Sequence, residues 1–197
     1  MKNKIIFAAA FAALALLVGG GATAGTARVE LVNVATNLRA DVMWASQQDG
    51  QGVFLWRNNT SASQEFDLIP MGGGYFQIRA RHSGKCLRFE DVPVYRNGTR
   101  IAQFPCPGPS RLSAQWSFVD MDPPCADNAL CIDIGWRVVK NRYTGKCIDT
   151  GNPSGKRPPE QAVLQQWRCI TSTRAWNADN QIWKLVDPLT RKTVLPG

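Results

Sequence analysis

Short stretches of the chain alternate between apolar and polar residues, and turn-forming residues separate them. Clear examples are YFQIRA (75–80), QWSFVD (115–120) and QIWKLVD (181–187). A period of two places every second side chain on one face, which is typical of a β-strand that faces a core. The intervening Gly, Pro, Asn and Asp favour tight turns. No long window beyond the N-terminal segment has a helical period, so the pattern predicts an all-β fold.

The N-terminal segment has a different pattern. Two lysines precede an apolar run from Ile5 to Val18, and ATA (22–24) is a small-x-small sequence. This order is typical of a secretory signal peptide, and the run is shorter than the ~20 apolar residues of a membrane-spanning helix. We therefore expect residues 1–24 to be removed, and residues 25–197 to form a single exported domain without a membrane span.

Composition narrows the classes of function. Removal of the two N-terminal lysines lowers the formal charge from +8 to +6, and no block of like charges remains. We interpret this as a solvated basic surface and expect no nucleic-acid partner. No CxxC motif is present and His82 is the only histidine, so we expect no metal and no cofactor. Ser/His or Cys/His chemistry would depend on His82, and nothing marks a catalytic carboxylate pair, so we predict no enzymatic activity.

Two parts of the chain repeat one another. Each contains Gly-Lys-Cys, then an aromatic residue two positions before a second cysteine, then a tryptophan in a short apolar alternation. One copy comprises SGKCLRF (83–89), RIAQFPC (100–106) and AQWSF (114–118), and the other comprises TGKCIDT (144–150), VLQQWRC (163–169) and NQIWKL (180–185). Internal repetition of this kind indicates a fold built from similar units.

A third copy lies upstream and lacks the cysteines. It comprises LVNVATNLRADV (31–42), VFLWRN (53–58) and SQEFDL (63–68). Arg39 and Asn58 together take the places of the two cysteines, as expected if the two positions are partners. The alignment predicts three lobes, at about residues 28–76, 77–136 and 137–188.

Six cysteines in an exported chain predict disulfides, and six cysteines allow fifteen pairings. The joint replacement of both cysteines in the first copy favours Cys86–Cys106 and Cys147–Cys169. The remaining pair, Cys125–Cys131, would then staple an insertion at residues 121–135, between the second and third copies.

These repeats resemble the ricin-type (ricin B-like) β-trefoil lectins. The resemblance rests on three motifs: Gly-Lys-Cys-aliphatic-Asp, the aromatic-x-Cys strand and a Gln-x-Trp motif in each lobe. The motif is complete in QIW (181–183), conservatively varied in QEF (64–66) and reduced to its tryptophan in AQW (114–116). The resemblance implies a disulfide-stapled β-trefoil of three lobes, with the three aromatic residues in the core. It also implies carbohydrate binding, with galactose-type sugars as the family's usual ligands.

The resemblance further implies a sugar site in the third lobe. A carboxylate accepts hydrogen bonds from two sugar hydroxyls, amides donate where the carboxylate cannot, and an aromatic ring covers the apolar face of a hexose. The third lobe has the family residue at all five positions, so we expect it to carry most of the binding. These positions are Asp149, Gln165, Trp167, Asn180 and Gln181.

The first lobe matches the family pattern in part. Asp41, Trp56 and Gln64 are present, whereas Phe54 and Ser63 depart from it. We expect at most a weak second site in this lobe.

The second lobe has lost the pattern. Arg88 stands at the position of the carboxylate, and Ser113 and Ala114 replace the two amides. Phe104 retains an aromatic platform, but we expect no sugar site.

A protein-interaction trefoil is the alternative from a different class. A protease inhibitor or a toxin-delivery subunit would bind a partner protein through loops such as CADNALC (125–131) or NPSGKRPPE (152–160). The five matching residues of the third lobe favour a lectin, and whether a catalytic or toxin partner exists stays open.

Overall fold

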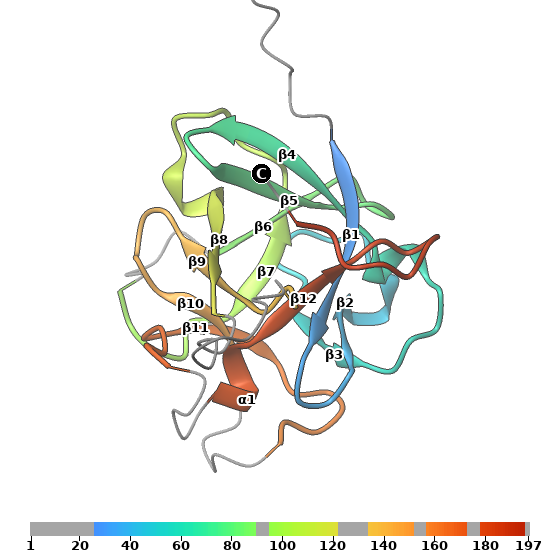
Figure 1. Ribbon diagram of the computed structural model, residues 1–197. Coiled ribbons are helices and arrows are strands. Elements are labelled where there is room, and N and C mark those ends of the chain that lie inside the picture. The colour runs from blue at the N-terminus through green and yellow to red at the C-terminus, as the bar shows by residue number, and fades with distance from the viewer. Residues whose placement is uncertain (1–25, 90–94, 122–133, 152–156, 173–177, 196–197) are drawn as a thin grey trace, which may run out of the picture.

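The computed structural model describes residues 26–89, 95–121, 134–151, 157–172 and 178–195, and these form an all-β fold (Figure 1). The predicted signal peptide and the Cys125–Cys131 pair lie outside the described residues. The described strands are β1 (Ala27–Asn33), β2 (Arg39–Val42), β3 (Val53–Trp56), β4 (Phe66–Gly72), β5 (Tyr75–Ala80), β6 (Cys86–Phe89), β7 (Ile101–Phe104), β8 (Trp116–Asp120), β9 (Arg137–Asn141), β10 (Cys147–Thr150), β11 (Leu164–Trp167) and β12 (Trp183–Val186). One four-residue helix, α1 (Ala178–Gln181), and three 3-10 turns, η1 (Met43–Ala45), η2 (Ala62–Gln64) and η3 (Leu112–Ala114), accompany them.

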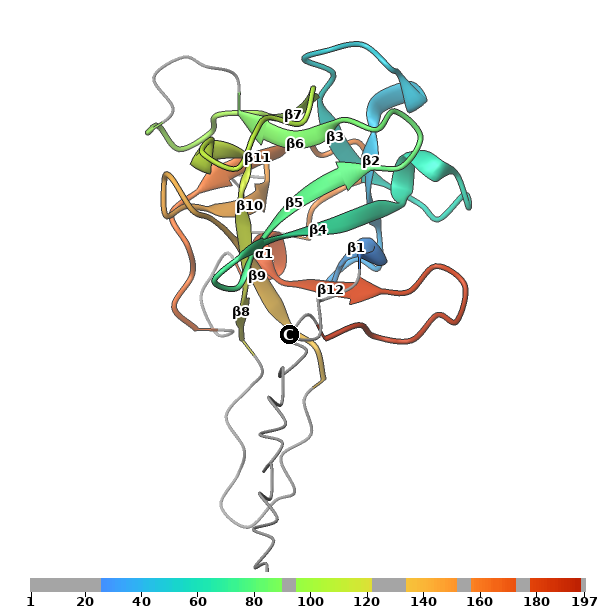
Figure 2. The same ribbon diagram turned by 90° about the horizontal axis from the view of Figure 1, so that it is seen from above.

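Six of the strands close into a barrel. In antiparallel pairs, β1 joins β4, β4 joins β5, β5 joins β8, β8 joins β9, β9 joins β12, and β12 returns to β1. The other six form three hairpins, β2–β3, β6–β7 and β10–β11. Figure 2 shows β3, β6, β7 and β11 together on one side of the molecule, away from β8, β9 and β12. A closed barrel with three hairpins is a β-trefoil, so the predicted fold class is confirmed.

The three hairpins begin in the same way. The chain enters each with a positive φ, 59° at Asn37, 68° at Gly84 and 66° at Gly145. Glycine adopts this conformation without cost, and asparagine tolerates it better than most residues. The first strand then pairs with the second in one common register, through Arg39–Trp56, Cys86–Phe104 and Cys147–Trp167. The structural equivalence includes the first copy, which has no cysteines.

The three aromatic residues predicted for the core are there. Phe66, Trp116 and Trp183 have no exposed surface. The indole N–H of Trp116 donates to the Leu87 carbonyl at 3.0 Å, and that of Trp183 donates to the Ile148 carbonyl at 3.3 Å. Burial of such a side chain contributes roughly 1.5–3 kcal/mol, and the hydrogen bonds satisfy the indole donors of both Trp116 and Trp183.

Both lobe disulfides form as predicted. Cys86 bonds to Cys106 and Cys147 bonds to Cys169, at sequence separations of 20 and 22. Each bridge ties the start of one hairpin strand to the segment that follows the other strand.

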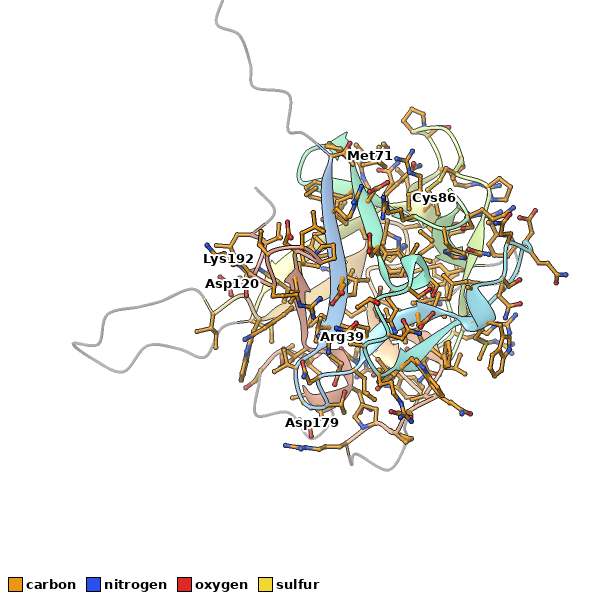
Figure 3. The ribbon with its side chains drawn as sticks, turned by 90° about the vertical axis from the view of Figure 1, so that its right-hand side faces the viewer. Arg39, Met71, Cys86, Asp120, Asp179 and Lys192 are labelled. Carbon is orange, nitrogen blue, oxygen red and sulfur yellow. A yellow bond between two sulfur atoms is a disulfide. The ribbon has the colours of Figure 1, made fainter. Side chains whose placement is uncertain are left out.

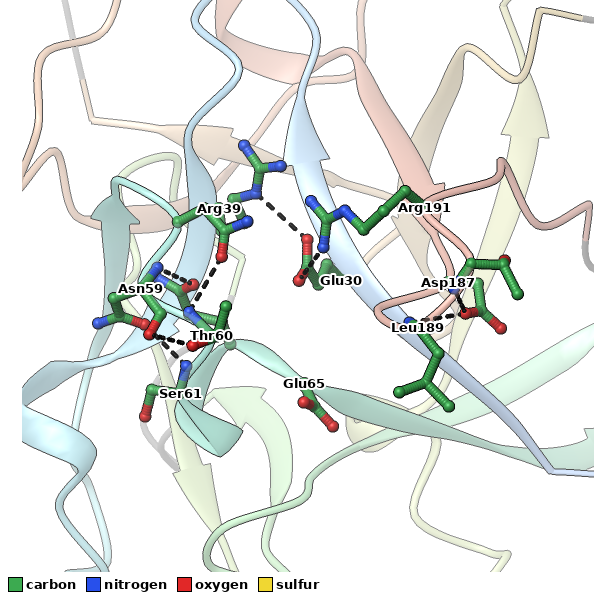
Figure 4. Close-up of polar contacts among 12 residues, drawn as sticks. Glu30, Arg39, Asn59, Thr60, Ser61, Glu65, Asp187, Leu189 and Arg191 are labelled. Carbon is green, nitrogen blue, oxygen red and sulfur yellow. Dashed lines mark hydrogen bonds and ion pairs between the residues drawn. The ribbon is translucent and has the colours of Figure 1, made fainter.

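In the first lobe, Arg39 stands at the position of the first cysteine and forms an ion pair with Glu30 of β1. Figure 4 shows Glu30 between Arg39 and Arg191. Arg39 Nε lies 3.2 Å from Glu30 Oε2, and Arg191 Nη1 lies 2.7 Å from Glu30 Oε1. Glu30 is only 2% exposed, and pairing with two guanidinium groups compensates for the burial of its charge.

Each lobe also reaches the next lobe through the loop of its hairpin. The loop donates a backbone N–H to the middle of the following lobe's second hairpin strand and accepts one in return. The donated bonds run from Gly50 to the Gln103 carbonyl (2.9 Å), from Gly98 to the Gln166 carbonyl (2.9 Å) and from Gln161 to the Leu55 carbonyl (2.8 Å). The hairpin of every lobe is therefore flanked by residues of the preceding lobe.

Candidate functional site

The third-lobe hairpin holds a buried carboxylate. Asp149 lies on β10 directly opposite Gln165 on β11. Its Oδ1 accepts a hydrogen bond from Gln165 Nε2 at 2.9 Å, and its Oδ2 accepts one from Gln181 Nε2 at 2.9 Å. The structure thus brings together three of the five residues predicted for this site.

Gln181 acts as a clamp for this carboxylate. It has no exposed surface and ends helix α1. Besides Asp149, its Nε2 donates to the Arg168 carbonyl at 3.0 Å, and its Oε1 accepts from the Ile170 N–H at 3.0 Å. All of these bonds are internal, so Gln181 orients Asp149 rather than reaching outward from the site.

The other two predicted residues lie close by in the fold. Trp167 follows Gln165 by two positions, so both point to the same face of β11, and Trp167 is partly exposed. Asn180 is buried in α1, which packs against β10. Figure 3 places the adjacent Asp179 at the opposite end of the molecule from Met71 of β4.

The Asp149 carboxylate is almost fully buried. It is 3% exposed, and this burial raises the pKa of its carboxyl to about 6, although the hydrogen bonds from Gln165 and Gln181 act in the opposite direction. The carboxyl is therefore ionised at neutral pH and protonated in mild acid. The pKa of Asp149 in the folded state exceeds its ordinary value of 3.8, so between pH 3.8 and about 6 the folded state binds more protons than the unfolded state. The stability of the fold therefore falls as the pH rises through this range.

We expect the binding of a sugar at Asp149 to weaken as the pH falls through about 6. The ionised carboxylate is the better acceptor, and protonation turns one of its oxygens into a donor. Titration calorimetry from neutral pH to below this value, on an Asp41→Ala background that isolates the third lobe, measures the effect. An affinity that stays constant across this range would contradict it.

The first lobe repeats the clamp. Gln64 Nε2 donates to Asp41 Oδ2 at 2.8 Å and to the Arg57 carbonyl at 2.8 Å, and Gln64 Oε1 accepts from the Asn59 N–H at 3.2 Å. Burial raises the pKa of Asp41, while hydrogen bonds from Ser63 and Gln64 oppose the rise. Ser63, a departure from the family pattern, thus lies near the carboxylate, and its hydroxyl donates to Ser61 Oγ at 2.9 Å.

A pocket of about 220 Å³ lies over Asp41. Three aromatic rings line it, with centroids 6.2 Å apart for Trp44 and Phe54 and 5.5 Å apart for Phe54 and Trp56. Its other lining residues are Ala45, Asn59, Ser61 and Ser63. The Asn59 side chain accepts from the Ser61 N–H at 3.0 Å and shapes the rim (Figure 4).

Sequence reasoning missed Trp44 as a site residue. Trp44 is 78% exposed and has a φ of 61°, both uncommon for tryptophan. The available signal was a tryptophan, shortly after the strand that carries Asp41, without a counterpart in the other two copies. Phe54, which was counted against the site, supplies the central ring of this pocket.

In the second lobe the aromatic platform is covered. The Arg88 guanidinium lies 4.1 Å from the centroid of the Phe104 ring, and its Nη1 donates to the Phe89 carbonyl at 3.0 Å. Such a cation–π contact occupies the face that a sugar would use. The geometry adds a second reason, beyond the missing carboxylate, to expect no site here.

A β-trefoil in which two of the three lobes hold a clamped carboxylate beside aromatic rings is a lectin-like architecture. Residues 15–104 match the family model for the ricin-type beta-trefoil lectin domain-like proteins. This match ends with β7, so it includes the whole first lobe and none of the third. The resemblance predicted from the repeats is confirmed.

Solved structures with the same fold support this assignment. A designed three-fold symmetric protein, ThreeFoil, is 28% identical with a TM-score of 0.66 over 81% of this chain and 98% of its own. The exo-beta-1,3-galactanase 1,3Gal43A of Clostridium thermocellum is 28% identical with a TM-score of 0.66, over 82% of this chain and 30% of the enzyme. The Macrolepiota procera ricin B-like lectin, solved with lactose, is 16% identical with a TM-score of 0.58, over 80% and 93% of the two chains.

No curated protein matches the chain. Within the described ranges, the helical segments lack the length and apolar character needed to cross a bilayer.

Proposed function

We propose that this protein is a carbohydrate-binding lectin whose main site is formed by the third-lobe residues around Asp149. The observation that carries the proposal is the clamped carboxylate beside a partly exposed tryptophan. Two glutamine amides fix the orientation of the carboxylate, and each of its oxygens keeps acceptor capacity for a sugar hydroxyl. Trp167 offers a flat apolar surface for the C–H face of the sugar.

The proposed ligands are galactose-type sugars, free or within a polysaccharide. The similarity to a galactanase at 28% identity supports this choice, although the chain spans only 30% of that enzyme. The proposed function requires no catalytic step.

We also propose that the protein is secreted. The signal-like pattern of residues 1–24 supports export, and the two described disulfides are of a kind that persists in oxidising compartments.

A glycan array probed with the mature protein tests the proposal. Binding to galactose-containing glycans, lost on competition with free galactose, is the expected result. A folded protein that binds no glycan would instead favour the protein-interaction or toxin-delivery alternative.

We propose a second, weaker sugar site at the aromatic pocket of the first lobe. Trp44→Ala should leave the third-lobe affinity unchanged and reduce retention on a dense galactose surface by roughly a hundredfold, because two linked sites gain avidity. Trp44 is 78% exposed, so the variant should keep its melting temperature. Surface plasmon resonance at high and low sugar density measures both quantities. Equal retention at high density would show that the first lobe does not bind.

A further inference from the structure

We infer that Gly98, a residue of the second lobe, determines which glycans the third-lobe site accepts. Because it has no side chain, it leaves the edge of that site open to a sugar that carries further residues. The inference rests on the proposed function and refines it from binding a sugar to binding within a glycan chain.

The loop that carries Gly98 is fixed against the third lobe. The Gly98 N–H donates to the Gln166 carbonyl at 2.9 Å, and the Gln166 N–H donates to the Thr99 carbonyl at 2.9 Å. The Asn97 side-chain oxygen accepts from the Arg168 N–H at 3.1 Å and from Lys146 Nζ at 2.7 Å. Residues 97–99 therefore have a defined position beside β11.

Gly98 faces two of the predicted sugar contacts. A Cβ atom at this position would lie 3.6 Å from Gln165 Oε1 and 4.0 Å from Trp167 Cζ3. These are ordinary contact distances, so a Cβ alone would fit. Any longer side chain would extend over the amide and the edge of the ring, which is the space a substituent on a bound sugar would need.

The first lobe provides the comparison. Its equivalent residue is Gln161, contributed by the third lobe, whose N–H donates to the Leu55 carbonyl at 2.8 Å. Leu55 is flanked by Phe54 and Trp56, as Gln166 is flanked by Gln165 and Trp167. Gln161 has a φ of 66°, against 86° for Gly98. The same backbone position thus carries a side chain beside the first-lobe hairpin and none beside the third-lobe hairpin.

This difference gives the two sites different ligand specificities. The first-lobe site, whose hairpin is flanked by Gln161, takes a terminal sugar. The third-lobe site, open at Gly98, takes a sugar that is substituted on that side, such as an internal residue of a galactan. The fold itself tolerates a glutamine at this backbone position, since Gln161 occupies it.

Gly98→Gln, made on the Asp41→Ala background, tests the inference. The probes are galactose and a β-1,3-linked galactan oligosaccharide, measured by titration calorimetry. We expect the affinity for the oligosaccharide to fall about tenfold or more while the affinity for galactose stays within about twofold. Gly98→Asn, with a shorter side chain that tolerates a positive φ, is the second variant if the first folds poorly.

Gly50→Gln is the matched control. Gly50 has a φ of 76° and the equivalent place beside the second lobe, where the flanking residues are Ala102 and Phe104. It should impose the same backbone cost and change neither affinity. Equal affinities of Gly98→Gln and its parent for both probes, or an equal loss of both, would overturn the inference alone. A parent protein that binds neither probe would overturn the proposed third-lobe site as well.

Discussion

Asp149→Ala is expected to weaken sugar binding by the third lobe roughly a hundredfold. A hydrogen bond to a charged group contributes about 1.5–3 kcal/mol, and each 1.4 kcal/mol is about a factor of ten in affinity. The substitution removes the acceptor for the sugar hydroxyls and also frees Gln165 and Gln181 from their shared partner. Titration calorimetry with galactose measures the loss.

The same substitution should also destabilise the fold. If Asp149 were exposed, its loss would leave the melting temperature unchanged, but it is 3% exposed and accepts two hydrogen bonds. Leaving buried amide donors unpaired costs about 1–3 kcal/mol. Asp41→Ala is the matched control, because it breaks the equivalent bond from Gln64 and should cost similar stability without altering the third-lobe affinity. Full galactose affinity in folded Asp149→Ala would place the site elsewhere.

Removal of the Cys147–Cys169 bridge by a double alanine substitution should strongly destabilise the fold. The bond closes a loop with a sequence separation of 22, which in the chain-entropy model stabilises the fold by about 3 kcal/mol. At roughly 2–4 °C per kcal/mol for a domain of this size, the melting temperature should fall by about 10 °C. Sugar affinity should fall too, because the bridge fixes the strands that carry Asp149 and Trp167.

The second lobe supplies the control for this experiment. Removal of Cys86–Cys106, at a separation of 20, should cost about the same stability. It should leave sugar binding intact, because Arg88 and Phe104 already occupy the corresponding place in that lobe. Calorimetric melting and galactose titration of both double variants separate the two effects. Equal losses of affinity in the two variants would contradict a third-lobe site.

Sequence alone predicted the features that repeat. The Gly-Lys-Cys motif determined how the hairpins align, because a turn with positive φ precedes the first strand of each hairpin. The paired loss of cysteines at Arg39 and Asn58 identified the two lobe disulfides, since both partners of a bond disappear together. The resemblance to the ricin-type lectins located the core aromatic residues at the Gln-x-Trp positions.

Features that depend on side-chain direction could not be predicted. A sequence motif does not show that Gln181 turns inward to clamp Asp149, or that Arg88 lies over Phe104. Trp44 has no counterpart in the repeat, and only the folded loop brings it to Phe54. The contact of Gly98 with the third-lobe residues crosses between lobes, and no pattern within one repeat contains it.

A crystal structure of the mature protein with a bound galactose-containing glycan tests the central claim most directly. The account predicts a sugar in the third lobe, with ring hydroxyls within hydrogen-bond distance of the Asp149 carboxylate and an apolar face against Trp167. Part of the glycan should continue past Gly98. A sugar bound only at a surface away from Asp149 would contradict the account.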